Sequence, residues 1–184
     1  MIDIVPLTII DPAAIETLLD DAFGADRHAR TAYKIREGTA WLPALSFAAV
    51  SGDGTLIGTL QSWQVALHTP DGAQHPITLV GPVAVLPVLQ RSGTGRAMMA
   101  AMLQVADAGL CDAMVMIGDP EYYDRFFGFS AKATSGWEVP GPVDRRRLLA
   151  RISRAAGLPA IGKLGPLHRG VDTLKQSHAA QTAS

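Results

Sequence analysis

Apolar and polar positions change period several times along the chain, and each change predicts a new secondary-structure element. Residues 2–7 follow the two-residue period of a strand. Asp11 then offers an N-cap and Pro12 a proline in the first helical turn, which predicts the start of a helix. Apolar residues recur at helical spacing up to Gly24, a residue type that commonly ends helices. The chain is therefore expected to begin with a strand and an amphipathic helix.

The middle of the chain has the patterning of short strands joined by turns. A polar segment over residues 26–38 comes first and is expected to be helical. We interpret most of its charged side chains as facing water: Arg27, His28, Arg30, Lys34, Arg36 and Glu37. Residues 45–50, 56–65 and 77–85 then read as strands, separated by turns rich in glycine and aspartate. Short turns join antiparallel neighbours, so this part is predicted to be an antiparallel meander.

The pattern changes again after residue 89. A glycine-containing loop over residues 90–95 leads into a helix over residues 96–108, and residues 113–117 form a short apolar strand. A strand, a helix and a strand in succession normally make a right-handed crossover with two parallel strands. Three weaker elements follow, a short helix over residues 121–126 and strands over residues 137–139 and 148–152. The whole pattern predicts a mixed α/β fold.

Composition narrows the classes of function. The chain has 184 residues, 48% of them apolar, and a formal net charge of -1. These values are typical of a packed domain and exclude a disordered chain or a strongly basic nucleic-acid-binding protein. No stretch approaches the roughly 20 apolar residues that span a bilayer, and the first residues lack the pattern of a signal peptide. We therefore expect a cytoplasmic protein with one domain over residues 1–168 and a loose tail over residues 169–184. The only cysteine, Cys111, can form no internal disulfide, and no metal site is expected.

The loop before the Met-rich helix has the features of a phosphate-binding site. A helix N-terminus presents unpaired backbone N–H groups and a partial positive charge. Gly93 and Gly95 leave the main chain open to a diphosphate. The neighbouring side chains add hydroxyl and guanidinium groups, from Arg91, Ser92, Thr94 and Arg96. The alternative is a tight turn whose glycines serve packing only.

Two common nucleotide-binding loops fit this segment poorly. No lysine follows the glycines, which excludes the P-loop. The dinucleotide fingerprint matches at Gly93 and Gly95, but Met98 stands where a third small residue belongs. Asp119, after the next strand, is placed as a ribose-binding acid could be, so a dinucleotide-dependent oxidoreductase stays open as an alternative.

Residues 90–95, Gln-Arg-Ser-Gly-Thr-Gly, resemble the Q/R-x-x-G-x-G/A signature of the GNAT acetyltransferase superfamily. Residues 81–87 look like the strand that precedes this signature. Residues 118–130 look like the strand end, short helix and Gly-Phe pair that follow it, and their Gly-Asp-Pro-x-Tyr-Tyr start is similar to a bacterial branch of predicted N-acetyltransferases. The resemblance implies a GNAT-like fold: a mixed, mostly antiparallel sheet of about six or seven strands flanked by helices, with a splay between the two parallel central strands.

The same resemblance implies a cosubstrate, acetyl-CoA, and the residues that hold it. Backbone N–H groups of the loop bind the pyrophosphate, from Arg91, Ser92, Gly93, Thr94, Gly95 and Arg96. The main chain of Val83, Ala84 and Val85 pairs with the pantetheine arm as if it were another strand. Pro82 and Pro87 fit this arrangement, because prolines near a central strand indicate a bulge or a splay; the alternative is a strand end at each proline.

For the chemistry, the resemblance implies a tyrosine on the short helix that protonates the departing thiolate. Tyr123 is the first candidate, because it fits the count forward from Asp119, and Tyr122 is the second; the count back from Gly128 points to Asp124. A buried structural tyrosine is the alternative for either position. The residues identify no general base; the candidates are Glu37, His28, His75 and Glu138, and a water relay leaves no trace in a sequence.

We therefore expect an acetyl-CoA-dependent N-acetyltransferase that passes its acetyl group directly to a primary amine in a ternary complex. The acceptor is a small-molecule or peptide amine, held by residues around 27–37 and 135–143, and no nucleic acid or membrane is involved. The oligomeric state is monomer or homodimer. A non-catalytic acyl-CoA-binding sensor or partner domain is the alternative, beside the oxidoreductase.

Overall fold

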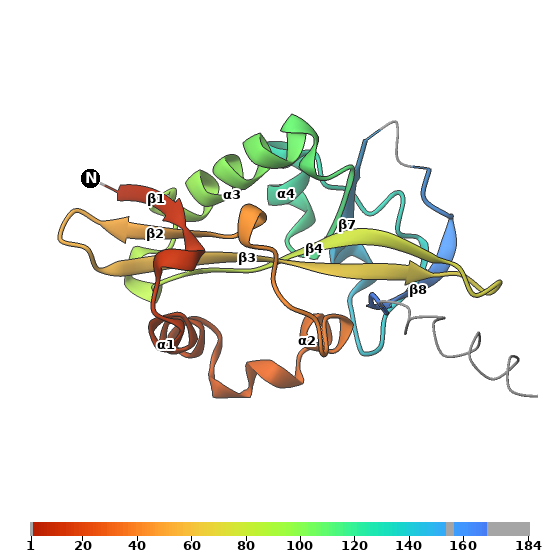
Figure 1. The fold of residues 1–184 in the computed structure, drawn as a ribbon, viewed down its shortest axis with the longest axis horizontal. Coiled ribbons are helices and arrows are strands. Elements are labelled where there is room, and N and C mark those ends of the chain that lie inside the picture. Colours follow the sequence, from red (N-terminus) through yellow and green to blue (C-terminus); the bar gives the residue numbers. More distant parts are fainter. Residues whose placement is uncertain (1, 154–156, 169–184) are drawn as a thin grey trace, which may run out of the picture.

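The computed structural model describes residues 2–153 and 157–168, and within them eight strands form one mixed sheet (Figure 1). The strands are β1 (Ile2–Pro6), β2 (Phe47–Ser51), β3 (Leu56–His68), β4 (Gln74–Val85), β5 (Ala113–Ile117), β6 (Gly136–Glu138), β7 (Leu148–Ile152) and β8 (Ile161–Pro166). The α-helices are α1 (Pro12–Phe23), α2 (Thr31–Ile35), α3 (Thr94–Val105) and α4 (Pro120–Phe127). The predicted mixed fold is confirmed, with eight strands in place of the expected six or seven.

The strand order is β1-β2-β3-β4-β5-β7, and β8 pairs with the last part of β3 and with β6. Neighbours are antiparallel except for β4 with β5 and β6 with β8. The parallel β4–β5 pair is the one that the crossover through α3 predicts. A sheet of this kind is not the doubly wound parallel sheet that the dinucleotide alternative requires.

Helices cover both faces of the sheet (Figure 1). The α1 and α2 helices lie on one face, where α1 buries Ile15, Leu18 and Leu19. The α3 and α4 helices lie on the other face, where α3 buries its methionines against those of β5: Met98, Met99, Met102, Met114 and Met116. Burial of a side chain of this size contributes roughly 1.5 to 3 kcal/mol, so these apolar stripes hold α1 and α3 on the sheet. Within the described ranges, no helix has the length and apolar character needed to cross a bilayer.

The two central parallel strands separate soon after they meet. Their pairing is confined to Thr78 with Met114 and Leu79 with Val115, although β4 continues for six more residues to Val85. On its other side β4 stays paired with β3 to its end. One edge of the last part of β4 therefore carries backbone groups that β5 does not use, which is the predicted splay.

A β-bulge lies at the point where β4 leaves β5. Val83 pairs with Leu60, but Val80 pairs with Ser62, so two residues of β4 oppose one of β3. Those two residues are Gly81 and Pro82, joined by a cis peptide bond. The bulge predicted for Pro82 is therefore present, whereas Pro87 lies beyond the end of β4 and starts a single 3-10 turn.

Two parts of the chain differ from the expectations. Residues 26–38 form a 3-10 turn (Ala25–Ala29) and the short helix α2 in place of one helix. The strand β8 was not predicted, because its two glycines weaken the strand pattern. A Cβ at Gly162 would lie 2.8 Å from a Leu67 side-chain atom and 2.9 Å from the His68 carbonyl oxygen, so close packing on β3 requires glycine there. The expected loose tail, residues 169–184, lies outside the described residues.

Candidate functional site

The glycine loop opens α3 with its first amides uncapped. Gly93 is the N-cap residue in the left-handed conformation, with φ 89°, and no side chain of the described residues caps the helix. Arg91 also has a positive φ of 68°, an unfavourable conformation for a side chain of this kind. The turn is therefore held in a shape that aims free backbone N–H groups away from the helix, and such groups bind anions.

A groove of about 290 Å³ lies in front of these amides. It is lined by the end of β4, the glycine loop and parts of α1 and α4: Val83, Ala84, Val85, Gln90, Arg91, Gly93, Gly95, Arg96, Ala22, Phe23, Tyr122 and Tyr123. A Cβ at Gly93 would meet nothing within 4 Å. A Cβ at Gly95 would meet only side-chain carbons of Val83 and Val85, at 3.9 and 3.8 Å. The glycines therefore leave space that a ligand can use, and they are not required by contacts within the protein.

Ser92 and Thr94 differ from the rest of the predicted loop residues because they do not line the groove. Thr94 is only 2% exposed, and its hydroxyl oxygen lies 2.7 Å from that of Ser92. The hydroxyls that we expected to face a phosphate therefore bond to each other. The backbone N–H groups of these two residues are unaffected by this bond.

A second, larger cavity of about 730 Å³ adjoins the groove. The two share the lining residues Phe23, Val83, Tyr122 and Tyr123. The larger cavity also takes lining residues from both segments predicted to form an acceptor pocket: residues 27–36 around α2, and Pro142 with Val143. It reaches the β4 bulge at Gly81 and the end of β5 at Gly118. Two molecules could therefore bind on either side of the tyrosines and approach each other there.

The α4 helix places both tyrosines at this junction. Its N-cap is Asp119, whose carboxylate accepts the Glu121 N–H at 3.0 Å, and its C-cap is Gly128 with φ 72°. Asp119 therefore caps a helix, and this role accounts for the aspartate without the ribose of a bound dinucleotide. Asp124, the position reached by counting back from Gly128, is exposed and lines neither cavity.

The two hydroxyls differ in their surroundings. Burial raises the pKa of Tyr123 to about 12, with the charge of Arg147 opposing that rise. Burial also raises the pKa of the less buried Tyr122, and the positive charge of Arg96 opposes it. Both hydroxyls therefore keep their protons at neutral pH and can donate them.

None of the four candidate bases lines the groove or the larger cavity. His28 and Glu37 line a neighbouring cavity of about 240 Å³, which shares Arg27, Tyr33 and Arg36 with the larger cavity. His75 lines a separate cavity of about 350 Å³ beside Cys111. Glu138 is exposed on β6. The carboxylates that do line the larger cavity are Asp119 and Asp144, and each accepts a backbone N–H at the start of a helix or turn.

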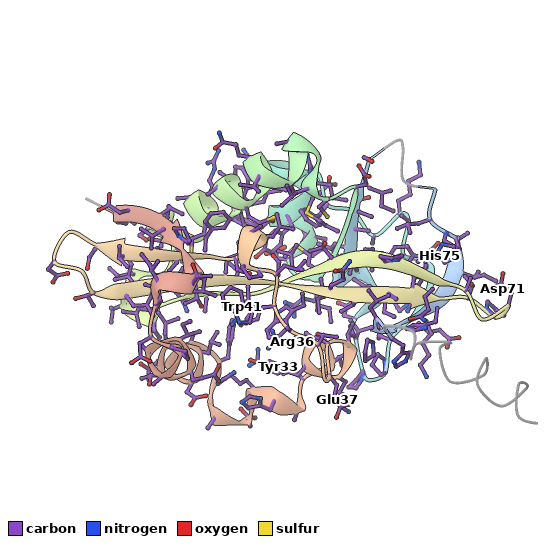
Figure 2. The ribbon with its side chains drawn as sticks, viewed as in Figure 1. Tyr33, Arg36, Glu37, Trp41, Asp71 and His75 are labelled. Carbon is purple, nitrogen blue, oxygen red and sulfur yellow. The ribbon has the colours of Figure 1, made fainter. Side chains whose placement is uncertain are left out.

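The expectation that the charges near α2 face water is wrong for Arg27 and Arg36, which are 2% and 6% exposed. Arg27 pairs with Glu16 and with Asp20, the latter at 2.7 Å. Figure 2 shows Tyr33 and Arg36 between α1 and α2, on the face of the sheet that these helices cover. Arg27, Thr31 and Ile35 are all buried at four-residue spacing, but only Ile35 is apolar, so no apolar period in the sequence indicates this inward-facing side.

The family comparison agrees with this geometry. The Acetyltransferase (GNAT) family model matches residues 13–129, well over half of the chain. The chain belongs to the acetyltransferase (GNAT) family. The predicted class of enzyme, an acyltransferase, is therefore confirmed. The match ends at Phe129, so it includes the glycine loop, the splayed end of β4 and both tyrosines of α4.

Solved GNAT structures share the fold. A GNAT family N-acetyltransferase (YhbS) from Escherichia coli, in complex with CoA, has 23% identity and a TM-score of 0.67, covering 91% of this chain and 89% of its own. A GNAT family acetyltransferase from Brucella melitensis, in complex with acetyl-CoA, has 23% identity and a TM-score of 0.58, covering 88% and 93%. No curated protein sequence matches the chain significantly.

Proposed function

We propose that this GNAT protein transfers the acetyl group of acetyl-CoA directly to a primary amine, with both molecules bound at once. The observation that carries this proposal is the junction of the groove and the larger cavity at Tyr122 and Tyr123. Two of the similar GNAT structures hold CoA or acetyl-CoA, which supports the choice of cosubstrate. The bacterial branch and the cytoplasmic location stay predictions from the sequence.

The residues of the groove suit acetyl-CoA. The uncapped amides of α3 would hold the pyrophosphate, with the guanidinium groups of Arg91 and Arg96 nearby. The free edge of β4 over Val83, Ala84 and Val85 would pair with the amides of the pantetheine arm, because a strand edge offers both N–H and C=O groups. This fit rests on the open space at Gly93 and Gly95, where added side chains would stand in the groove.

Bound acetyl-CoA supplies an acetyl thioester, and the protein orients it. A backbone N–H near Val85 stabilises the negative charge that develops on the carbonyl oxygen when the amine nitrogen attacks the thioester carbon. Tyr123 then donates its hydroxyl proton to the departing sulfur. The proton that the attacking neutral amine loses as the amide forms returns to the Tyr123 oxygen through solvent, so the hydroxyl is restored and atoms and charge balance. Tyr122 is the second candidate for this proton, since it lines the same junction.

One observation favours a second candidate function, that of a non-catalytic acyl-CoA-binding sensor. Among the described residues, no histidine or glutamate lines the groove or the larger cavity, and the two aspartates that line the larger cavity, Asp119 and Asp144, each already accept a backbone N–H. No unengaged carboxylate or imidazole is therefore placed to deprotonate an ammonium. An acyl-CoA-binding sensor needs no such group. Thiol release from acetyl-CoA in the presence of an amine panel separates the two, because only the enzyme produces free thiol.

The sharpest test of the groove is Gly95→Glu with Ala100→Glu as its matched control. Glutamate at Gly95 places a carboxylate in the groove, while the same residue at the exposed Ala100 adds the same charge to the same helix outside it. A glutamate near a helix N-terminus is compatible with the fold. By titration calorimetry, we expect Gly95→Glu to weaken acetyl-CoA binding at least about 100-fold, or roughly 2.7 kcal/mol, and Ala100→Glu to leave it unchanged. Equal affinity of the two variants would contradict the proposed cosubstrate site.

A further inference from the structure

We propose that the acceptor amine carries a carboxylate group and that Arg36 binds this group in the larger cavity. The inference deepens the proposed function and rests on it, since it names the chemical class of the second substrate. The chemistry that the site recognises is shared by free amino acids and by peptides with an acidic residue close to their N-terminus.

Arg36 is a buried cation held in one orientation. It is 6% exposed, and Figure 2 shows it close to Tyr33. The carbon of its guanidinium lies 4.0 Å from the Tyr33 ring centre and 3.9 Å from the Trp63 ring centre. The two rings hold the guanidinium by cation–π contacts without using its N–H donors. Those donors remain for a partner that reaches the edge of the group.

The described residues offer few hydrogen-bond acceptors to these N–H donors. The one hydrogen bond of the Arg36 side chain among the described residues goes from Nη1 to the Gly81 carbonyl oxygen, at 3.5 Å. No carboxylate of that part of the chain lies within 4.0 Å of it, whereas Arg27, as deeply buried, pairs with both Glu16 and Asp20. Burial lowers the pKa of Arg36 to about 10, helped by the positive charge of Arg27 and opposed by Tyr33 and by the charge of Glu16. A buried charge of this kind is costly unless something pairs with it.

The position of Arg36 is suited to an acceptor. Its bond to Gly81 places it at the β4 bulge, two residues before Val83, where the proposed pantetheine edge begins. On the other side of the splay, Arg147 donates from Nε to the Gly118 carbonyl oxygen at 3.2 Å, at the end of β5. A carboxylate bound between these guanidinium groups would lie beside the junction at which the amine must meet the thioester.

The charges around the cavity favour an anion. Four arginines line it, Arg27, Arg30, Arg36 and Arg147, against the aspartates Asp119 and Asp144. Arg27 is paired with Glu16 and Asp20, and the other three arginines still outnumber the two aspartates. Glu16 and Glu37 line the smaller cavity on another side of Arg36, and Glu16 is already paired with Arg27. A carboxylate matches the planar, forked donors of a guanidinium and forms charge-assisted hydrogen bonds with them. Arg36 would in this way gain the partner that the protein itself does not provide.

The experiment compares acceptors that differ in the carboxylate alone. The free-amine pairs are lysine with 1,5-diaminopentane and phenylalanine with phenylethylamine; the peptide pairs have glutamate or glutamine next to the N-terminal residue. For the wild-type protein we expect kcat/KM to be at least about tenfold higher for the carboxylate member of either the amine or the peptide pairs, and the arm that shows it identifies the source.

Arg36→Gln should remove this preference. We expect its KM for the carboxylate acceptor to rise at least about tenfold, with the KM for acetyl-CoA unchanged. Arg36→Lys keeps the positive charge but lacks the paired N–H donors of a guanidinium, so it should retain part of the preference that Arg36→Gln loses. Arg146→Gln, an exposed arginine paired with Glu121 outside the cavity, is the matched control and should keep the full preference.

The outcomes distinguish this inference from the proposed function. An active enzyme that uses both members of every pair equally would overturn the inference and leave the acetyltransferase proposal standing. If no amine releases thiol, titration of the protein–CoA complex with the same pairs decides whether Arg36 selects a carboxylate, and the absence of turnover counts against the proposed function. If Arg36→Gln does not fold, the ratio measured for the wild-type protein and for Arg36→Lys decides the question.

Discussion

At the scale of single residues, Tyr123 is the group whose removal should separate chemistry from binding. Tyr123 lines both cavities where they meet, and its phenyl ring packs beside Gly118. Phenylalanine keeps the ring, so we expect Tyr123→Phe to lower kcat about 100-fold with little change in acetyl-CoA affinity. The measurement is steady-state thiol release together with titration calorimetry. An unchanged kcat would remove Tyr123 from the mechanism and direct attention to Tyr122.

The pH profile offers a second test of the same residue. Because burial raises the pKa of Tyr123 to about 12, its hydroxyl stays protonated up to roughly pH 11 and can act as an acid throughout. We therefore expect kcat to show no alkaline decline attributable to this group below about pH 11. A decline near pH 10 that disappears in Tyr123→Phe would mean that the hydroxyl is far better solvated than the structure indicates.

The candidate residues of the glycine loop could be located from the sequence, whereas the burial of Arg36 could not be predicted from it. Gly93 and Gly95 could be recognised because glycine, which has no side chain, lets an anion come close to the backbone at a helix N-terminus. Arg36 stands in a run of charged residues, and nothing in that run distinguishes it from the exposed Lys34. Its burial depends on Tyr33 and Trp63, and Trp63 belongs to a strand far along the chain. A contact between side chains so far apart in the sequence leaves no pattern in the residues around Arg36.

At the scale of elements, the close contact of α3 with β3 depends on Gly58. A Cβ there would lie 2.9 Å from Met98 Cε, 3.1 Å from the Ala84 carbonyl oxygen and 3.3 Å from Thr94 Cγ2. The methionine end can move, but the carbonyl oxygen and the first turn of α3 have little room. We expect Gly58→Ala to lower the free energy of unfolding by about 1 to 3 kcal/mol, measured by chemical denaturation.

The control for Gly58→Ala is Gly95→Ala, in the first turn of the same helix. There an added Cβ makes ordinary contacts at 3.8 Å or more, and alanine favours a helix more than glycine does. Gly95→Ala should therefore unfold no more easily than the wild-type protein. If both alanines have the same effect on stability, the close approach of α3 to Gly58 is not what limits the packing of this helix.

Elements with a strong local period could be placed from the sequence, and elements defined by distant partners could not. The α1 helix combines an N-cap, a first-turn proline and a buried stripe, and it begins where these features predict. The β7 strand over Leu148–Ile152 also lies where it was expected. In contrast, β8 has glycines at two of its six positions, and its pairing with β3 joins residues about 100 positions apart. Only the folded sheet identifies it as a strand.

At the scale of the whole molecule, the feature that no segment reveals is the meeting of two cavities. The junction takes Phe23 from α1, Val83 from β4 and the two tyrosines from α4. The resemblance to the GNAT superfamily implied the groove, and the family match confirms the family to which these elements belong. The larger cavity forms where β4 and β5 separate, and the segment at Pro142 and Val143 lines another part of it. Its shape depends on segments that meet only in the fold.

Adjoining cavities have a kinetic consequence. When cosubstrate and acceptor bind side by side, the acetyl group passes between them without resting on the protein, so initial rates should give intersecting double-reciprocal lines. A covalent route needs a nucleophile that reaches the thioester, and it gives parallel lines. Cys111, the only thiol in the chain, lines the separate 350 Å³ cavity, and its sulfur lies 3.2 Å from Thr78 Oγ1.

We therefore expect Cys111→Ala to keep the kcat of the wild-type protein within about twofold, because this thiol takes no part in transfer. Mass spectrometry of the protein after incubation with acetyl-CoA alone should show no acetyl adduct. Parallel lines, or an acetylated protein that passes its acetyl group to an amine, would show that the two substrates act in turn. The junction at Tyr122 and Tyr123 would then have to admit one substrate at a time, a behaviour that the size of the larger cavity, about 730 Å³ beside the groove, gives no reason to expect.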